Sequence, residues 1–384
     1  MISRRVFGRK FAIAALAIAM SACQTVPRQR VVAPPPPPAP SGPSASVLPT
    51  DTARHRVALL VPLSGENADV GQAIANATQM AILDTNATNL RVTTYDTAAN
   101  PGAAAANAIR DGNKLILGPL QREEVAPIAQ RARAANVPLI TFSNDTSVAT
   151  PDVFVMGHVP EQSIARTVGY ARAHGVARFA ALVPNGDYGT RAAAALQQAV
   201  GRAGGSVVGI EQYDRANTSI ISAANRLKAK GGYDAVLIAD SPRVAAMGAA
   251  PLVAGGVRPR ILGTERWSGE AVVTTSPSLR GAWFSAVSDT RFRQFSASYK
   301  TRFGDAPRRL ATLGYDAVLL TLRIARDWQP GRDFPTGRMT APDGFLGLDG
   351  PFRFRANGLG ERALEVRQVG AGAVTTVDPA AAKF

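Results

Sequence analysis

The sequence predicts an α/β protein built from two doubly wound, Rossmann-like lobes. From residue 56 onward, short apolar runs typical of buried strands alternate with helix-like segments, as in parallel βαβ units. At least eight such strands are expected, which is more than one open sheet of ordinary width holds. Several of them end in small polar or glycine-containing turns, the position at which doubly wound sheets bind ligands.

The elements follow one another in a regular order. Strands are expected at residues 56–64, 90–97, 114–120, 137–143, 178–184, 206–214, 233–240 and 260–264. Amphipathic or alanine-rich helices are expected between them, including residues 69–83, 123–135, 161–174, 190–200 and 219–230. The segment GFLGLDGPFRF near the C-terminus has the pattern of a turn and hairpin, which we expect to close the second lobe.

Residues 1–23 have the pattern of an export signal. A basic start, MISRRVFGRK, precedes the apolar run FAIAALAIAM, which is too short to span a bilayer. The following MSAC resembles the lipobox of bacterial prolipoproteins and predicts lipidation of Cys23; an ordinary cleavage site with a chance cysteine is the alternative. SRRVF also resembles a twin-arginine signal, so the export route stays open.

Residues 24–54 are rich in proline, serine and alanine and lack apolar periodicity. This composition predicts a disordered tether between a lipid anchor and a domain at residues 55–384. The expected location is the periplasm, with the protein held at the membrane by its lipid. Gln24 follows the cysteine, where aspartate is associated with inner-membrane retention, so the outer membrane is favoured in a Gram-negative cell.

Composition argues against several classes of protein. One cysteine and three histidines in 384 residues argue against a zinc or thiol redox centre, and we expect no metal and no cofactor. The common nucleophile, phosphate-loop, dinucleotide and metalloprotease motifs are absent, so we expect no catalysis. The formal charge of +15 is spread along the chain without a basic and aromatic run. It suits anionic neighbours in the cell envelope better than nucleic acid.

The polar turns supply the candidate ligand contacts. Each places hydroxyls, carboxylates or free backbone N–H groups close to a helix start, where an anionic group is stabilised. Helix capping is an equally good explanation for any one of these residues, and we expect Asp187 to be such a cap. The candidate ligand-binding residues are Ser64, Arg122, Ser143, Asp145, Thr146, Ser147, Ser241 and Glu265.

A specific resemblance covers almost the whole expected domain. VALLVPLSGENADVGQAIANATQMAI, LILGPL, VPLITFSND, FAALVPNGDYG, YDAVLIAD, RILGTERW, GAWF and LGYDAVLL resemble, in order, segments of the leucine/isoleucine/valine-binding protein family. Its type I periplasmic binding fold implies three crossovers between the lobes. The first lobe would take about 55–160 and 288–340, and the second about 161–287 and 341–384. The chain is also similar to the lipoprotein branch of penicillin-binding protein activators.

The resemblance also implies roles for some of the candidate residues. Glu265 falls where the family uses a glutamate against the ligand's ammonium group, and Thr146 or Ser147 falls near its carboxylate contacts. Arg122, Val70 and Ser241 fall where the family has a serine, an aromatic wall and a tyrosine. Arg122 could bind a carboxylate or phosphate itself, or it could be a solvated arginine at a helix start.

Two functions follow from the resemblance as expectations. The first is a non-catalytic receptor that delivers an amino-acid-like or other polar solute to an ABC permease. The alternative is an envelope lipoprotein that activates a peptidoglycan synthase, in which case the surface of the lobes, rather than the cleft, would meet the partner.

Overall fold

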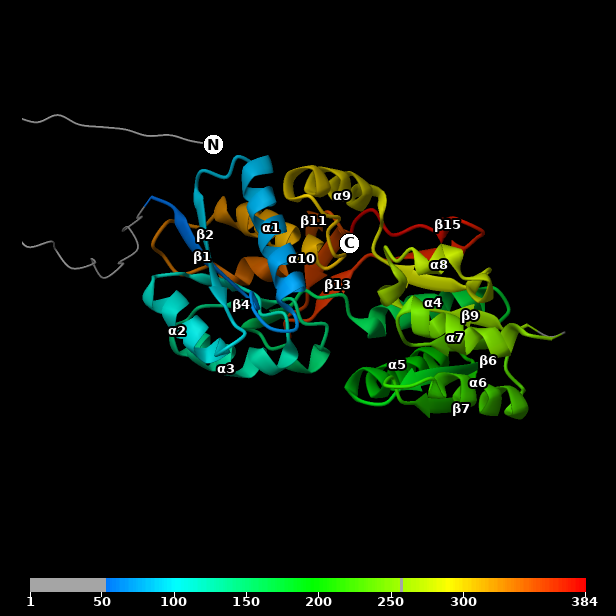
Figure 1. Ribbon diagram of the computed structural model, residues 1–384. Helices are drawn as coiled ribbons and strands as arrows, with labels where there is room; N and C mark the ends of the chain where they lie inside the picture. The colour runs from blue at the N-terminus through cyan, green and yellow to red at the C-terminus, as the bar shows by residue number, and fades with distance from the viewer. Residues whose placement is uncertain (1–52, 256–257) are drawn as a thin grey trace, which may run out of the picture. The chain divides into compact units, whose positions relative to one another are not determined.

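The computed structural model describes residues 53–255 and 258–384 (Figure 1). The predicted export signal, the predicted lipidation site Cys23 and nearly all of the tether expected at 24–54 lie outside the described residues. The described residues form two large sheets with flanking helices and one small three-stranded sheet. The prediction of an α/β fold with two doubly wound lobes is therefore confirmed.

The first lobe is built on a five-stranded parallel sheet. Its strand order is β2 (Leu90–Asp96), β1 (His55–Val61), β3 (Leu115–Leu117), β4 (Leu139–Thr141) and β5 (Val153–Val155). Alternate side chains of β1 enter different cores, because successive residues of a strand point to opposite faces. Leu59 packs with one core and Leu60 with the other. Both faces are therefore apolar, which explains the continuous hydrophobic run in the sequence.

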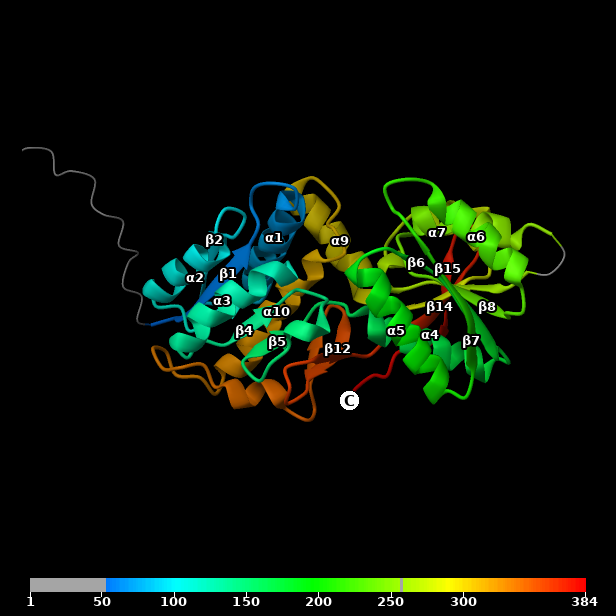
Figure 2. The same cartoon turned by 90° about the horizontal axis from the view of Figure 1, so that it is seen from below.

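Five helices cover this sheet. One face packs against α1 (Ala68–Asp84) and α10 (Ala311–Ala325), and the other packs against α2 (Pro101–Arg110) and α3 (Arg122–Ala134). The fifth helix, α9 (Thr290–Phe303), packs on the outside of α1, and the two lie side by side in Figures 1 and 2.

The second lobe is built on a seven-stranded mixed sheet. Its order is β15 (Val374–Asp378), β14 (Glu365–Val369), β10 (Trp283–Ala286), β9 (Arg260–Leu262), β8 (Ala235–Ile238), β6 (Arg178–Pro184) and β7 (Ser206–Tyr213). The strands β6 to β10 run parallel, whereas β14 pairs antiparallel with both of its neighbours.

Helices also cover both faces of the second sheet. The helices α4 (Pro160–Ala173) and α5 (Asp187–Arg202) pack on one face, and α6 (Ser219–Lys230), α7 (Pro242–Val253) and the short α8 (Val272–Thr275) pack on the other. Figure 2 shows α4 and α5 on one side of the sheet and α6 and α7 on the other.

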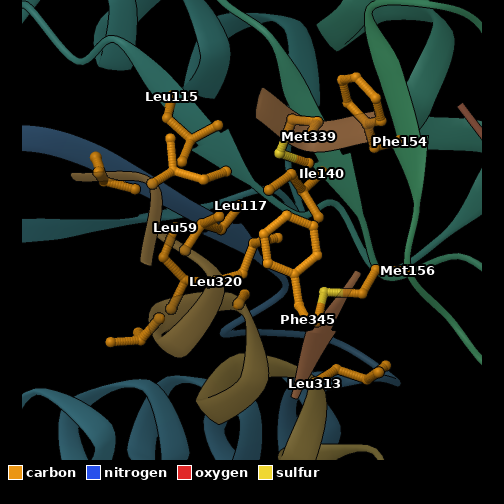
Figure 3. Close-up of a cluster of buried hydrophobic side chains, with 14 of the residues drawn as sticks. Leu59, Leu115, Leu117, Ile140, Phe154, Met156, Leu313, Leu320, Met339 and Phe345 are labelled. Atoms are coloured by element: carbon orange, nitrogen blue, oxygen red, sulfur yellow. The ribbon is translucent and has the colours of Figure 1, made fainter. Parts of the chain in front are cut away.

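The C-terminal hairpin corrects one prediction. We expected all of residues 341–384 in the second lobe, but the three-stranded sheet of β11 (Phe345–Gly347), β12 (Gly350–Phe354) and β13 (Gly360–Arg362) belongs to the first. Phe345 and two further phenylalanines of the hairpin join the first-lobe core. Figure 3 shows Phe345 among Ile140, Met156 and Leu320. Leu359 also bridges to Val155 at the edge of the first sheet.

Between helices and strands of the described residues, the chain crosses from one lobe to the other at 156–159, 287–289 and 363–364. After β15 its last residues return to the first lobe, where the Arg353 guanidinium of β12 lies over the ring of Phe384. The three crossovers implied by the resemblance are therefore present. They place the carboxyl-terminal ends of the parallel strands of both lobes around a common space, and the loops at those ends carry the candidate site.

Candidate functional site

A cavity of about 420 Å³ lies between loops of the two lobes. The first lobe contributes apolar walls, the side chains of Val70, Leu120, Phe142 and Leu310. The second lobe contributes the loop that follows β9, including Glu265. Eight of the twelve lining residues are polar or charged, including Glu265 and three arginines. Polar groups that converge on one cavity fix the orientation of a small molecule, so this cavity suits a polar solute.

Glu265 is held in place by the packing of its own loop. It opens a single 3-10 turn, Glu265–Trp267, whose indole is buried and donates a hydrogen bond to the backbone carbonyl of Asp240 at 3.0 Å. Gly263 lies flat against this indole, and a Cβ atom there would meet ring carbons at 2.4 Å. Glycine is therefore required before the turn, and the turn places Glu265 in the wall of the cavity.

Only one of the two oxygens of the Glu265 carboxylate has a hydrogen-bond partner in the described residues. The hydroxyl of Tyr188 donates to Oε1 at 3.1 Å, whereas Oε2 is buried without a hydrogen-bond partner. Burial raises the pKa of Glu265 from its ordinary value of 4.5 to about 7. Because leaving a buried carboxylate oxygen unpaired is costly, this group is poised to accept a hydrogen bond from a cationic donor in the cavity.

Four of the predicted residues come together beside the cavity, around Asp145. The Asp145 carboxylate is nearly buried, with 4% of its side chain exposed. It accepts hydrogen bonds from the backbone N–H and the hydroxyl of Ser147, at 2.8 and 2.6 Å, and from Arg122 at 3.0 Å. The hydroxyl of Ser143 accepts from the N–H of Asp145 at 3.1 Å. Burial by itself would raise the pKa of Asp145, but the bonds from Ser147 and Arg122 outweigh it and lower the pKa.

Arg122 also reaches the other lobe. Its guanidinium lies 2.8 Å from Asp187 at the start of α5. The prediction that Asp187 caps this helix is wrong, because Gly186 occupies the cap position without a side-chain bond and the Asp187 carboxylate turns toward Arg122. Arg191, one turn further along α5, donates to the Asn144 carbonyl at 2.5 Å and pairs with Glu161 at 2.8 Å. Charged hydrogen bonds thus connect the two lobes at the rim of the cavity.

The remaining predicted residues lie elsewhere. Ser64 donates to Asp96 at 2.9 Å at the end of β1, and the N–H of Ser241 binds the side chain of Asp240. Thr146 opens a short 3-10 turn, Thr146–Val148, whose preceding residue is Asp145. Of the eight predicted ligand-binding residues, only Glu265 is among the described residues that line the 420 Å³ cavity.

Several lining residues were not predicted. Arg308 and Arg309 follow α9 in a loop with no recognisable motif, and His158 lies on the first crossover. Apart from their amino acid types, the sequence gives no signal that these residues line a cavity, because their contacts are with residues far along the chain.

A buried ionic cluster lies beside the crossovers. Asp349 accepts hydrogen bonds from His158 at 2.7 Å and from Thr312 at 2.9 Å, and it pairs with Arg309 at 2.9 Å. Burial opposes ionisation of Asp349, yet the nearby Arg309 and His158 lower its pKa, whereas burial lowers the pKa of His158. This cluster ties the first crossover to α10 and the hairpin, and we assign it a structural role.

The described residues contain neither a metal-binding cluster nor a membrane-spanning helix. Across 53–255 and 258–384, no three His, Cys, Asp or Glu residues are grouped so as to hold a metal ion. In the same part of the chain, no helix is both long and apolar enough to cross a bilayer.

Two curated proteins match part of the sequence. An uncharacterized protein of Rickettsia prowazekii is 29% identical over 160 residues, or 41% of this chain and 43% of that protein. The penicillin-binding protein activator LpoA of Glaesserella parasuis is 28% identical over 149 residues, or 38% of this chain and 25% of that protein. The match therefore spans less than half of each relative.

Solved structures match the fold over most of the chain. A protein assigned as a branched-chain amino acid ABC transporter from Rhodospirillum rubrum has a TM-score of 0.76 at 20% identity, covering 84% of this chain and 100% of that one. The substrate-binding protein LivJ of Streptococcus pneumoniae, in complex with isoleucine, has a TM-score of 0.64 at 18% identity, covering 85% and 100%. A solute-binding protein of R. palustris in complex with benzoate has a TM-score of 0.65 at 18% identity, covering 86% and 98%.

A family model described as periplasmic binding protein matches residues 55–373, which is nearly the whole described domain. Members of such a family bind rather than catalyse, in agreement with the expectation from the sequence. The chain belongs to the periplasmic binding protein family.

Proposed function

We propose that this protein binds a small polar solute that carries an ammonium group, with Glu265 as its partner. The unpaired, buried Oε2 of Glu265 carries the proposal, because it is an acceptor at the wall of a 420 Å³ cavity without a donor among the described residues. An ammonium group brings a charge as well as hydrogen bonds. Charged hydrogen bonds are about twice as strong as neutral ones.

The solute would then pass to an ABC permease. The similar structures from Rhodospirillum rubrum and Streptococcus pneumoniae are described as parts of branched-chain amino acid transporters, and the benzoate complex shows that this fold accepts other solutes. Lipidation of Cys23 and the tether of residues 24–54 would hold the binding domain at the membrane in the periplasm, which suits delivery to a membrane protein.

A second candidate function is activation of a peptidoglycan synthase. The similarity to LpoA over 149 residues favours it. The ion pairs of Arg122 with Asp187 and of Arg191 with Asp145, which join the lobes, also favour it, because a regulator needs a fixed surface more than a mobile cleft. The working part would then be an outer face of the lobes, and the cavity would stay without a solute.

A thermal-shift screen of the purified protein separates the two functions. The panel contains amino acids, amino acid amides, small amines, aromatic acids and peptidoglycan fragments. A solute present at one hundred times its dissociation constant adds about 2.7 kcal/mol to the free energy of unfolding, which is easily seen as a higher melting temperature. A shift with an amine-containing solute supports the receptor.

The variant Glu265→Gln is the matched test of the proposed contact. Glutamine keeps the size and the bond to Tyr188 but removes the charge, so affinity should fall by about 1.5–3 kcal/mol. Unchanged affinity in this variant would remove Glu265 from the site. If no compound in the panel raises the melting temperature, and if the protein binds a synthase equally well with and without Glu265→Gln, activation of a synthase would replace solute binding as the proposed function.

A further inference from the structure

A second, larger cavity adjoins the candidate site. It has a volume of about 650 Å³ and lies along α1 and α9, the two helices that stand side by side in Figures 1 and 2. We call it the α1/α9 groove. Its volume exceeds that of the site cavity, which is about 420 Å³.

The groove and the site cavity share one wall. Four residues line both: Ser268, Glu270, Arg308 and Arg309. Part of this wall is the ion pair between Arg308 and Asp69, whose side chains are 66% and 52% exposed. Exposed ion pairs contribute little to stability, so a ligand can displace the Arg308 side chain and extend from one cavity into the other.

The groove offers both aromatic surface and amide groups. Phe292, Tyr299 and Phe303 of α9 supply the aromatic surface. Gln72 and Asn76 of α1 supply carboxamides, and Gln72 donates to Asn76, which in turn donates to the Tyr299 hydroxyl. A carboxamide has both donors and an acceptor, which matches the alternating N–H and C=O groups of a peptide backbone.

The donors that a ligand can reach lie in the wall that the two cavities share. The N–H and hydroxyl of Ser147 and the guanidinium of Arg122 are already bonded to Asp145. Arg308 and Arg309 line both cavities, and the Nε of Arg309 is buried without a hydrogen-bond partner in the described residues. Arginine N–H groups donate to carbonyl oxygens as well as to carboxylates, and a peptide that passes this wall into the groove presents both.

From these observations we propose that the solute is a short peptide with a free amino terminus. Its ammonium group binds Glu265, and its chain continues past Arg308 into the α1/α9 groove. This inference rests on the proposed receptor function and adds the class and the length of the solute.

The experiment blocks the groove without touching Glu265. Ser296 of α9 lines the groove, and its side chain makes no hydrogen bond recorded in the described part of the chain, so Ser296→Trp fills the groove. Ser298 lies on the same helix, is exposed and is outside the groove lining, so Ser298→Trp is the matched control. Gln72→Trp fills the groove from α1 and serves if the first variant unfolds.

The purified full chain is incubated with four probes, and the retained compounds are identified by mass spectrometry after gel filtration. The probes are the twenty amino acids, a tetrapeptide library with free amino termini, the same library after N-acetylation, and amino-sugar oligomers. We expect wild type and Ser298→Trp to retain free tetrapeptides. Ser296→Trp and Glu265→Gln should each weaken this binding at least tenfold, and acetylation should abolish it.

The other outcomes are distinct. Retention of a single amino acid that depends on Glu265 but not on Ser296→Trp or Gln72→Trp would overturn the peptide inference and leave the receptor function standing. Retention of an amino-sugar oligomer that Ser296→Trp releases would overturn the peptide assignment. Retention of no probe by the wild type would remove the receptor function and the inference together.

Discussion

Replacing Glu265 by glutamine should remove a pH dependence from the folding stability of the unliganded protein. Burial raises the pKa of this carboxyl to about 7, against an ordinary value of 4.5 that applies to the unfolded chain. Between these values the folded protein keeps a proton that the unfolded chain has lost. The stabilisation by this group is therefore complete below pH 4.5 and falls as the pH rises to about 7.

The magnitude follows from the size of the shift. One pKa unit corresponds to about 1.4 kcal/mol, so the ionised Glu265 costs the wild type about 3 kcal/mol at pH 8. Glutamine has no proton to lose and keeps the bond to the Tyr188 hydroxyl. Relative to the wild type, Glu265→Gln should therefore gain about 3 kcal/mol between pH 4.5 and pH 8.

Urea unfolding followed by tryptophan fluorescence at several pH values measures this difference. Comparing the variant with the wild type cancels the other groups that titrate in the same range. Glu270→Gln, an exposed change in the same loop, is the control and should keep the pH dependence of the wild type. A constant difference between Glu265→Gln and the wild type from pH 4.5 to 8 would refute the claim that burial controls this carboxyl.

Three further predictions concern packing, the contact between the lobes and the membrane anchor. Gly189→Ala places a Cβ atom 1.7 Å from a carbonyl oxygen at the end of β6, so the free energy of unfolding measured by chemical denaturation should fall by about 2–3 kcal/mol. The control Gly201→Ala, on the same helix, places its Cβ atom where nothing lies within 4 Å and should raise the free energy of unfolding by a few tenths to about 1 kcal/mol. Equal effects of the two changes would contradict the packing described. Arg191→Ala removes a partner of Asp145 and a hydrogen bond between the lobes. The free energy of unfolding should therefore fall by about 1–3 kcal/mol, and X-ray scattering should show a larger radius of gyration. An unchanged radius of gyration would mean that this arginine does not hold the two lobes together. Cys23→Ser should release the protein from membranes in cell fractionation, and full retention would contradict lipidation at this residue.

Much of the fold could be predicted because its signals are local. The run that became β1 is apolar on both faces, as a central parallel strand requires, and its neighbours follow the same rule. The turn containing Asp145 and Ser147 was predicted as polar, and the structure shows the two side chains bonded to each other, an interaction between residues two positions apart.

The interactions that were missed join distant parts of the chain. Asp349 binds His158, 191 positions away, and neither residue type indicates in the sequence that the two side chains are in contact. The hairpin was placed in the wrong lobe for the same reason, since its position depends on phenylalanines that reach the core around Ile140 and on the bridge from Leu359 to Val155. Periodicity identifies a hairpin, but it does not indicate the surface on which the hairpin packs.

The candidate site was predicted in outline and not in its contacts. Glu265 was placed at the end of a strand, and it lines the cavity. Arg122 was expected to bind a ligand anion or to be solvated, but it bonds to Asp145 and Asp187, because the second lobe brings a carboxylate to it. Which side chains remain free for a ligand depends on these contacts between distant segments.

The central claim is that a solute with an ammonium group binds between the lobes at Glu265. Isothermal titration calorimetry, with the wild type and Glu265→Gln side by side and the solute retained by the wild type, tests it most directly. We expect saturable binding to the wild type that weakens at least tenfold in the variant. Equal affinity for both proteins would contradict it.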